Sequence, residues 1–267
     1  MIEYKNFVLP KVFFIGATDI DLNELVRYLE YTDQKEFIED IASGINEGLN
    51  RGEILCSFYA KLCYASLTNK KNKNISKIRS IHDNILSILD TGHGSVLEHC
   101  NLNFVVTNCS RVYTHELVRH RVGTAFSQTS GRYVRNDELN IIYDPILDPI
   151  KEDCEQLRQY IENWYKKVQL KSGLEDMTDF GKKKKMTSAL RRFMPNGQSN
   201  EIGFSVNLRT LRQTIEARTS EHAEWEIRLI FNQIYELVKD KYPAIFSDAK
   251  LKMIDGQNEI TFKNKKI

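Results

Sequence analysis

The spacing of hydrophobic residues predicts helices along most of this 267-residue chain. Apolar side chains recur every three or four positions, which is the period of a helix with one buried face. Asp21 and Glu24 have the spacing of a capping box before the first such segment, and Ser220 is predicted to cap the last. The predicted helices cover residues 22–31, 37–45, 54–65, 78–89, 110–121, 151–170, 175–193, 208–218 and 221–240.

Shorter apolar runs predict strands at residues 8–16, 104–107 and 201–206. Gly92 is expected to end the helix before it, because glycine adopts positive φ at low cost. The polar stretches 67–76 and 123–131 are predicted to be loops. With no internal repeat and no evident linker, the sequence predicts a single domain over residues 1–267.

Charge and composition then narrow the class of protein. The 38 basic and 36 acidic residues leave a net charge of +2, so no global field favours nucleic acid or membranes, and an anionic ligand needs a local cluster of cations. No apolar run reaches the roughly 18 residues of a membrane span, and the start of the chain lacks a signal-peptide pattern. A cytoplasmic protein is expected.

Cysteine and histidine spacing argues against metal or thiol chemistry. Five cysteines without a C-x-x-C pair favour reduced thiols over disulfides or zinc. Two of them, Cys100 and Cys109, lie in apolar surroundings that should raise the thiol pKa. The histidine pairs lack the i, i+4 spacing of helical metal ligands, so no metal site is predicted.

The densest cationic stretch begins at Arg119-His120-Arg121 and ends at Ser130-Gly131-Arg132. If the first three residues end a helix, the two arginines would point about 200° apart and could reach two ligands. A serine hydroxyl, a glycine and a bidentate arginine are the parts of a phosphate cradle. The alternative is that the cations complement the helix dipole and the small residues only turn the chain.

A second cluster follows residue 206. Arg209 and Gln213 fall within about one turn of a predicted helix, and Arg218 lies at its far end, where it could face a ligand. An ordinary surface lattice of arginine and glutamate ion pairs is the alternative.

Together these clusters resemble the ThyX family of flavin-dependent thymidylate synthases. The family signature is Arg-His-Arg, seven residues, then Ser; here eight residues separate Arg121 from Ser130, and Ser130-Gly131-Arg132-Tyr133 matches the family's ending. Residues 92–99, 191–195 and 207–226 resemble further family segments in family order. The resemblance covers roughly residues 55–240, whereas residues 1–50 and the tail after about 250 match poorly.

The resemblance implies an α/β fold of the α+β type, with helices around a small, mostly antiparallel sheet. It also implies a homotetramer whose active sites are shared between subunits. The implied reaction methylates dUMP to thymidylate, with methylenetetrahydrofolate as carbon donor and hydride from FAD that NADPH has reduced. No protein nucleophile attacks the base in this family.

The resemblance also implies roles for individual residues. Arg218 would be catalytic, stabilising negative charge on the pyrimidine. Glu116 departs from the family, which usually has glutamine there, and is expected to form an ion pair within the site. The implied contacts to the nucleotide are Glu116, Arg119, Ser130, Gly131, Arg132, Arg191 and Arg218. The implied contacts to FAD are His93, Ser95, Arg119, His120, Arg121, Gln128, Asn207, Arg209 and Gln213.

Two other functions stay open at this point. The longer loop and Glu116 lie where the family binds its nucleotide, so the same chemistry on UMP or another pyrimidine nucleotide is one alternative. A flavin- or nucleotide-binding protein without catalysis is the other.

Overall fold

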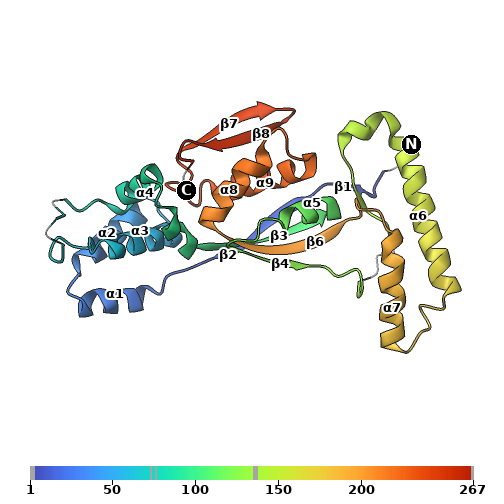
Figure 1. Ribbon diagram of the computed structural model, residues 1–267, viewed down its shortest axis with the longest axis horizontal. Coiled ribbons are helices and arrows are strands. Elements are labelled where there is room, and N and C mark those ends of the chain that lie inside the picture. Colours follow the sequence, from blue (N-terminus) through green and yellow to red (C-terminus); the bar gives the residue numbers. More distant parts are fainter. Residues whose placement is uncertain (1–3, 73, 76, 135–137, 266–267) are drawn as a thin grey trace.

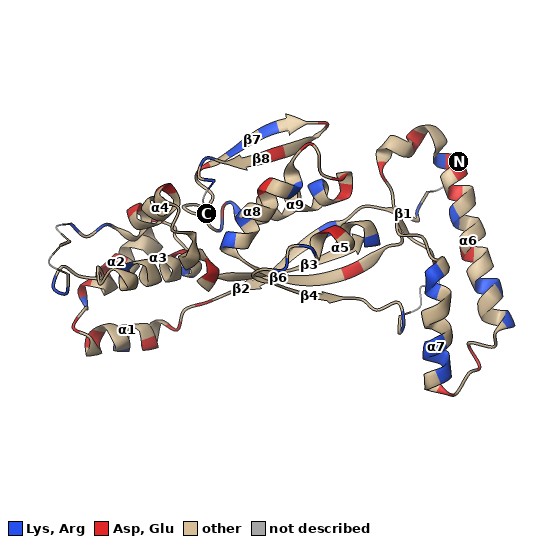
Figure 2. Ribbon diagram, in the orientation of Figure 1, with Lys and Arg blue, Asp and Glu red and all other residues tan. Residues whose placement is uncertain are grey.

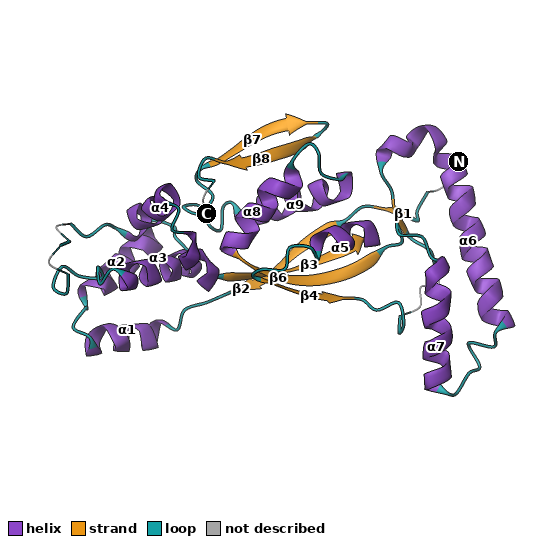
Figure 3. Cartoon of the chain, in the orientation of Figure 1, coloured by secondary structure: helices purple, strands orange, loops and turns teal. Residues whose placement is uncertain are grey.

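A four-stranded antiparallel sheet forms the centre of the molecule (Figure 1). The computed structural model describes residues 4–72, 74–75, 77–134 and 138–265. Strand order is β2-β3-β6-β4, from β2 (Lys11–Ala17), β3 (Asn101–Cys109), β6 (Asn200–Asn207) and β4 (Thr124–Gln128). With helices around small antiparallel sheets, the chain has the mixed α+β composition that was predicted (Figure 3).

One face of this sheet carries the core. Leu102, Phe104 and Val106 alternate along β3 and are buried against the segment formed by α8 (Leu208–Thr219) and α9 (Trp225–Val238). Helix α5 (Arg111–Leu117) packs on α9 at the same face. The opposite face is more open, since Phe13 on β2 is 43% exposed and pairs with half-buried Val105.

Helices from the first third of the chain pack at one end of the sheet. They are α1 (Leu22–Tyr31), α2 (Glu36–Asn46), α3 (Arg51–Cys63) and α4 (Ile81–Thr91). As predicted, α4 ends at Gly92, whose φ is +72°. The 3-10 helix η1 (Gly94–His99) leads from there into β3.

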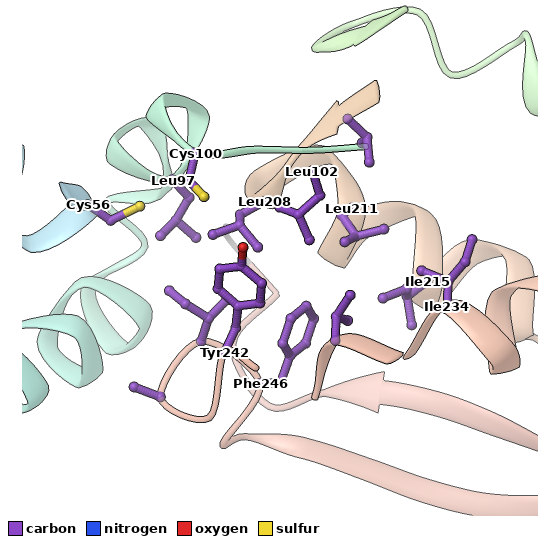
Figure 4. Close-up of a cluster of buried hydrophobic side chains, with 14 of the residues drawn as sticks. Cys56, Leu97, Cys100, Leu102, Leu208, Leu211, Ile215, Ile234, Tyr242 and Phe246 are labelled. Carbon is purple, nitrogen blue, oxygen red and sulfur yellow. The ribbon is translucent and has the colours of Figure 1, made fainter. Parts of the chain in front are cut away.

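Buried side chains join this helical end to α8 and to the segment after α9. Figure 4 shows Cys56 and Cys100 with Leu208 and Tyr242 in this contact. Burial raises the pKa of the Cys100 thiol to about 12, and that of Cys109 to about 12 as well, which confirms the direction predicted for both. All five cysteines are free.

A helical arm lies at the other end of the sheet (Figure 1). It contains η2 (Pro145–Ile150), α6 (Lys151–Lys171), α7 (Phe180–Leu190) and η3 (Arg191–Phe193), with a small core of its own around Tyr165. The short parallel pair β1 (Phe7–Val8) and β5 (Ile141–Ile142) lies at its base.

The last strands form a hairpin, β7 (Ala249–Ile254) with β8 (Gln257–Phe262), which packs on α8 and α9. Arg212 of α8 is 2% exposed and binds Asp248 at 2.8 Å, with its guanidinium 4.1 Å from the centre of the Phe262 ring. The main core therefore extends from Val12 to Phe262 and includes much of the poorly matched N-terminal segment.

Two predictions of chain path were wrong. The predicted loop 123–131 contains strand β4, because residues 124–128 form backbone hydrogen bonds with β6. The types of these residues alone did not indicate a strand. The predicted strand 8–16 is split between β1 and β2 at Pro10, which cannot donate to a ladder.

Several predicted helix ends were also wrong. The helix predicted for 110–121 ends at Leu117, so the argument that Arg119 and Arg121 diverge on a helix fails. Three helices begin later in the sequence than predicted, each directly after a residue whose side chain caps it. Ser80 caps α4, Asp179 caps α7, and Glu224, not Ser220, caps α9. Asp21 caps α1 as predicted.

Within the described ranges, every helix is too short or too polar to cross a bilayer. The same residues contain no group of three or more His, Cys, Asp or Glu placed to hold a metal ion.

Candidate active site

Arg218 lies at the end of α8, where side chains from the α5 region hold it. Its Nη1 donates to Glu116 Oε2 at 2.7 Å and its Nη2 to the Glu116 carbonyl at 3.3 Å. Its Nε donates to His120 Nε2 at 2.8 Å. The expected ion pair of Glu116 is therefore made with Arg218, and both groups keep partial exposure, 19% for Arg218 and 26% for Glu116.

His120 is the neutral member of this network. Burial and the neighbouring Arg218 charge lower the pKa of the imidazole, so its Nε2 lone pair stays available to accept the arginine N–H. The backbone of His120 is held as well, because Thr124 Oγ1 donates to the His120 carbonyl at 2.5 Å. The guanidinium is fixed before any ligand arrives.

A buried carboxyl group secures α5 itself. Glu226 Oε1 accepts from the Ser110 N–H at 2.7 Å, and Ser110 Oγ donates to Glu226 Oε2. Ser110 is also the N-cap of α5, because its Oγ accepts from the Tyr113 N–H at 3.1 Å. Burial raises the pKa of Glu226 to about 7. Glu226 thus joins α9 to the helix that carries Glu116.

A cleft of about 710 Å³ opens at the arm end of the sheet, and we call it the nucleotide cleft after the ligand that the family resemblance implies for Gly131 and Arg191, two of its lining residues. Three arginines line it, Arg111, Arg191 and Arg192, together with Gly131. A Cβ on Gly131 would come within 3.8 Å of Arg111 Nη2 and 4.0 Å of Arg191 Cδ. Among described residues, no carboxylate within salt-bridge distance pairs with these three guanidiniums, so their charge is open to an anion.

The turn beside this cleft presents further donors. The Ser130 carbonyl accepts hydrogen bonds from the N–H groups of Tyr133 and Val134, both at 3.0 Å, and these bonds close a tight turn. Arg132 donates from Nη2 to the Tyr133 hydroxyl at 3.3 Å, whereas its buried Nε has no acceptor in the described part of the chain. A ligand oxygen could satisfy that donor.

A second cleft, of about 970 Å³, lies at the helical end, and we call it the cofactor cleft after the ligand that the family resemblance implies for three of its lining residues. These three residues are His93, Ser95 and Arg209. Tyr64 lies beside His93, with its hydroxyl 3.3 Å from Nδ1 and the two rings stacked 6.1 Å apart. Arg209 also pairs with Glu98 at 2.6 Å, as the surface-lattice alternative predicts.

The remaining expected cofactor residues lie outside the lining of either cleft. Arg119 and Arg121 are exposed in the turn after α5, with Arg121 6.0 Å from the Phe126 ring centre. Gln128 donates to Thr114 Oγ1 at 3.3 Å, and Gln213 is exposed on α8.

Asn207 caps α8 and approaches Gly123 so closely that a Cβ there would be 2.1 Å from Asn207 Nδ2. Gly123 also has φ of +69°, so both its conformation and its surroundings require glycine.

The sequence reasoning missed Arg111 and Tyr64. Each contributes to a cleft that otherwise contains predicted site residues. Arg111 directly follows a helix cap, and Tyr64 directly follows α3. A helix-end position next to the motif segments was the only available signal, and it is shared by many residues without function.

The two clefts lie at opposite ends of the sheet. Residues 94–96, in the cofactor cleft, precede β3, whereas Thr107 and Asn108, in the nucleotide cleft, end it. Strand β6 gives the same order, since it starts at Asn200 in one cleft and leads to Arg209 in the other. Nine residues of strand span about 25–30 Å, which is the order of their separation along β3.

Comparison with known proteins identifies the family of the chain. The family model of Thy1, described as thymidylate synthase complementing protein, matches residues 47–244. A flavin-dependent thymidylate synthase of Mycobacterium avium is 31% identical, over 78% of this chain and 84% of the relative. Proteins with the same name from Corynebacterium diphtheriae (29% identical; 79% and 85% covered) and Mycobacteroides abscessus (31%; 78% and 84%) are similarly related.

Proposed function

The chain belongs to the Thy1 family of thymidylate synthase complementing proteins, and we propose that it is a flavin-dependent thymidylate synthase. It methylates dUMP with a carbon from methylenetetrahydrofolate and hydride from FAD, which NADPH reduces. The observation that carries this proposal is Arg218, an arginine fixed by Glu116 and His120 near the end of a helix.

The nucleotide cleft suits the phosphate of dUMP. Arg191 and Arg111 face the cleft beside Gly131, where the absence of a side chain permits close approach. Ser130 adds a neutral donor to the same turn, and Arg132 adds a charged one through its Nε, which has no acceptor among the described residues. Arginine is well matched to phosphate because its planar fork can donate two parallel hydrogen bonds.

Arg218 provides electrostatic stabilisation in this account. As the pyrimidine becomes nucleophilic at carbon 5, negative charge develops on the ring, and a guanidinium that is already oriented stabilises it without reorganisation. Glu116 neutralises the arginine in the absence of ligand. His120, held neutral, fixes the guanidinium through Nε without adding a second positive charge.

The cofactor cleft has donors that fit FAD. His93, Ser95 and Arg209 line one cleft and would hold part of the flavin dinucleotide, with Arg209 suited to its pyrophosphate. The family resemblance implies further FAD contacts, which we also propose: Asn207, Arg119, His120, Arg121, Gln128 and Gln213. When bound, the flavin supplies the hydride that reduces the transferred carbon.

Separation of the two clefts supports active sites shared between subunits, and the family resemblance implies that these subunits form a homotetramer. Hydride transfer requires flavin and pyrimidine in direct contact, yet one chain places its two sets of ligand residues about a strand's length apart. A neighbouring copy can bring its cofactor cleft to the nucleotide cleft of this one. The open sheet face with Phe13 offers apolar surface for such a contact.

We further propose one catalytic domain over residues 1–267, located in the cytoplasm. The common core from Val12 to Phe262 supports the single domain. Free cysteines, including exposed Cys63, suit a reducing compartment.

The test begins with the visible spectrum of the purified protein. The protein is then given methylenetetrahydrofolate, NADPH and equal amounts of dUMP and UMP, and methylated product is followed by mass. Flavin absorbance with thymidylate as product is expected. Methylated UMP would keep the mechanism and change the substrate, whereas a protein that binds no flavin would contradict the proposal.

A further inference from the structure

The second helix of the arm carries a run of lysines that has no part in the account above. Residues 180–193, which form α7 and η3, include four lysines and two arginines but no Asp or Glu. Figure 2 shows these basic residues along α7. The two arginines, Arg191 and Arg192, line the nucleotide cleft, so the lysines extend its positive charge along the arm.

Two of the four lysines are held at the start of α7, and two are open. Lys182 lies 4.0 Å from Asp179, and Lys183 donates from Nζ to the Glu175 carbonyl at 3.3 Å. In the part of the chain that the structure describes, no carboxylate lies within salt-bridge distance of Lys184 or Lys185. The charge of these two ammonium groups is therefore available to an anion from solution.

Helical spacing places the open lysines in line with the cleft arginines. Arg191 follows Lys184 by seven residues, and Arg192 follows Lys185 by seven, which is two turns on one face of a helix. Two small residues lie between the cations and leave the surface between them uncovered. We call this surface the arm strip, and its residues are Lys184, Lys185, Ser188, Ala189, Arg191 and Arg192.

Tyr133 joins the arm strip to the turn beside the nucleotide cleft. Its ring stacks with Phe180, with the ring centres 6.2 Å apart, and Lys184 Nζ lies 4.9 Å from its centre. The Lys184 ammonium and the Arg132 guanidinium lower the pKa of the Tyr133 hydroxyl, as expected where the local potential is positive. Positive charge is therefore continuous from this turn to α7.

The length of the arm strip suits a short chain of carboxylates. Lys184 and Arg192 are eight residues apart, which is about 12 Å at the rise of a helix. A glutamate joined through its γ-carboxyl adds about 6 Å when extended, because it has two more main-chain carbons than an ordinary residue. Each such unit keeps a free α-carboxylate, so about two units span the strip.

We propose that the arm strip binds the glutamate tail of the carbon donor and makes the enzyme favour donors with several glutamates. This inference rests on the proposed function, in which methylenetetrahydrofolate gives its carbon to a pyrimidine in the nucleotide cleft. The donor ends in a glutamate, and each further glutamate joined through a γ-carboxyl adds one negative charge. Lysine suits a tail of this kind, because a flexible ammonium can follow carboxylates that have no fixed orientation.

The experiment compares the FAD-loaded wild-type chain with Lys185→Ala and with the double variant Lys184→Ala/Lys185→Ala. The KM is measured for methylenetetrahydrofolate with one, three or five glutamates. Calorimetry measures the binding of tetrahydrofolate with one or three glutamates, which has no carbon to transfer. Sedimentation gives the oligomeric state. Lys250→Ala/Lys252→Ala, a pair of exposed lysines on β7, is the matched control.

The wild-type KM should fall about three- to tenfold from one glutamate to three, from the usual strength of exposed ion pairs, and change little from three to five. The double variant should lose most of this gain and keep its KM for the monoglutamate, its KM for dUMP and its oligomeric state. Lys185→Ala, which leaves the Tyr133 contact intact, should lose part of the gain. High salt should reduce the gain in the wild type.

Three results would overturn the inference: a wild-type KM that is independent of tail length, a double variant that keeps the gain, or a double variant that changes its oligomeric state. The last would assign the arm strip to a contact between subunits. The proposed function fails separately, because it requires turnover with the monoglutamate. If turnover is absent, the preference for three glutamates in the calorimetry still decides whether the strip binds the tail.

Discussion

The arginines of the nucleotide cleft and Arg218 differ in whether protein groups bind their guanidiniums. In the cleft, Arg111, Arg191 and Arg192 face solvent without a carboxylate partner among the described residues. Arg218 is held at three of its nitrogens by Glu116 and His120. An open arginine, which has no carboxylate partner, can attract a charged group from water. A held arginine, whose orientation is already fixed, can stabilise developing charge with little cost in reorganisation free energy.

The difference predicts two kinds of mutational effect. Binding should depend on the open arginines, and the chemical step should depend on the held one. Glu116 is also expected to affect the chemical step, because its carboxylate orients Arg218. The same carboxylate repels an anionic ligand, so it does not favour binding.

The largest effect is expected from Arg218→Ala. Removing an oriented donor to developing charge lowers kcat by about 100- to 1000-fold in comparable sites. The visible spectrum should show FAD bound as in the wild type. Arg218→Lys, which keeps charge without the planar fork, should recover only part of the rate. An unchanged kcat for Arg218→Ala would remove this residue from the mechanism.

Arg191→Ala should affect binding more than turnover. Loss of a charged hydrogen bond to phosphate is expected to raise the KM for dUMP roughly 10- to 100-fold, with kcat changed little. Arg27→Ala is a suitable control, because Arg27 is exposed and pairs with Glu24 on α1. If kcat falls and the KM holds, the distinction between open and held arginines is wrong.

Gly123→Ala tests the turn that joins the two regions, since β4 follows it and leads toward Ser130. The left-handed backbone costs about 1–2 kcal/mol for alanine, and contact with Asn207 adds to it. Gly48→Ala is the matched control, because Gly48 has φ of +88° but open space around its Cβ. Urea unfolding should show a larger loss for residue 123; equal losses would show that the Asn207 contact is unimportant.

A further effect concerns the support of α5. Because burial raises the folded-state pKa of Glu226 to about 7, well above an unfolded value near 4.3, its favourable contribution is complete below about pH 4 and is lost as pH rises to 7. Glu226→Gln should therefore flatten the fall in stability between pH 5 and 8, by on the order of 1–3 kcal/mol. Thermal unfolding at both pH values measures this; a parallel pH dependence in the two proteins would mean that Glu226 does not titrate there.

Local signals were sufficient for much of the fold. The period of apolar residues predicted α1, α8 and most of α6, and Gly92 marked the end of α4. Strand β4 was not predicted because Thr124, Ala125 and Ser127, three of its five residues, are small or hydroxylated and give no strand pattern without the pairing with β6. Helix starts at Ser80, Asp179 and Glu224 depended on caps that compete with nearby polar residues.

The candidate site was predictable in its residue types and less so in its grouping. The motifs pointed to Arg218 and Glu116, and the structure brings them into contact with His120. Nothing in the spacing indicated that Arg191 and Arg209 lie at opposite ends of the sheet, since that depends on the direction of β6. Arg111 and Tyr64 had no signal of their own beyond their position at helix ends.

The central claim is that each complete active site joins the nucleotide cleft of one chain to the cofactor cleft of another. Co-expression of Arg191→Ala and Arg209→Ala chains, followed by purification of mixed oligomers, tests it directly. Assayed at a dUMP concentration far below the raised KM of Arg191→Ala, each variant alone should have little activity. Mixed oligomers should recover about a quarter of wild-type sites, the fraction in which both contributing clefts are intact under random assembly. Mixed oligomers with no more activity than the separate variants would contradict the account.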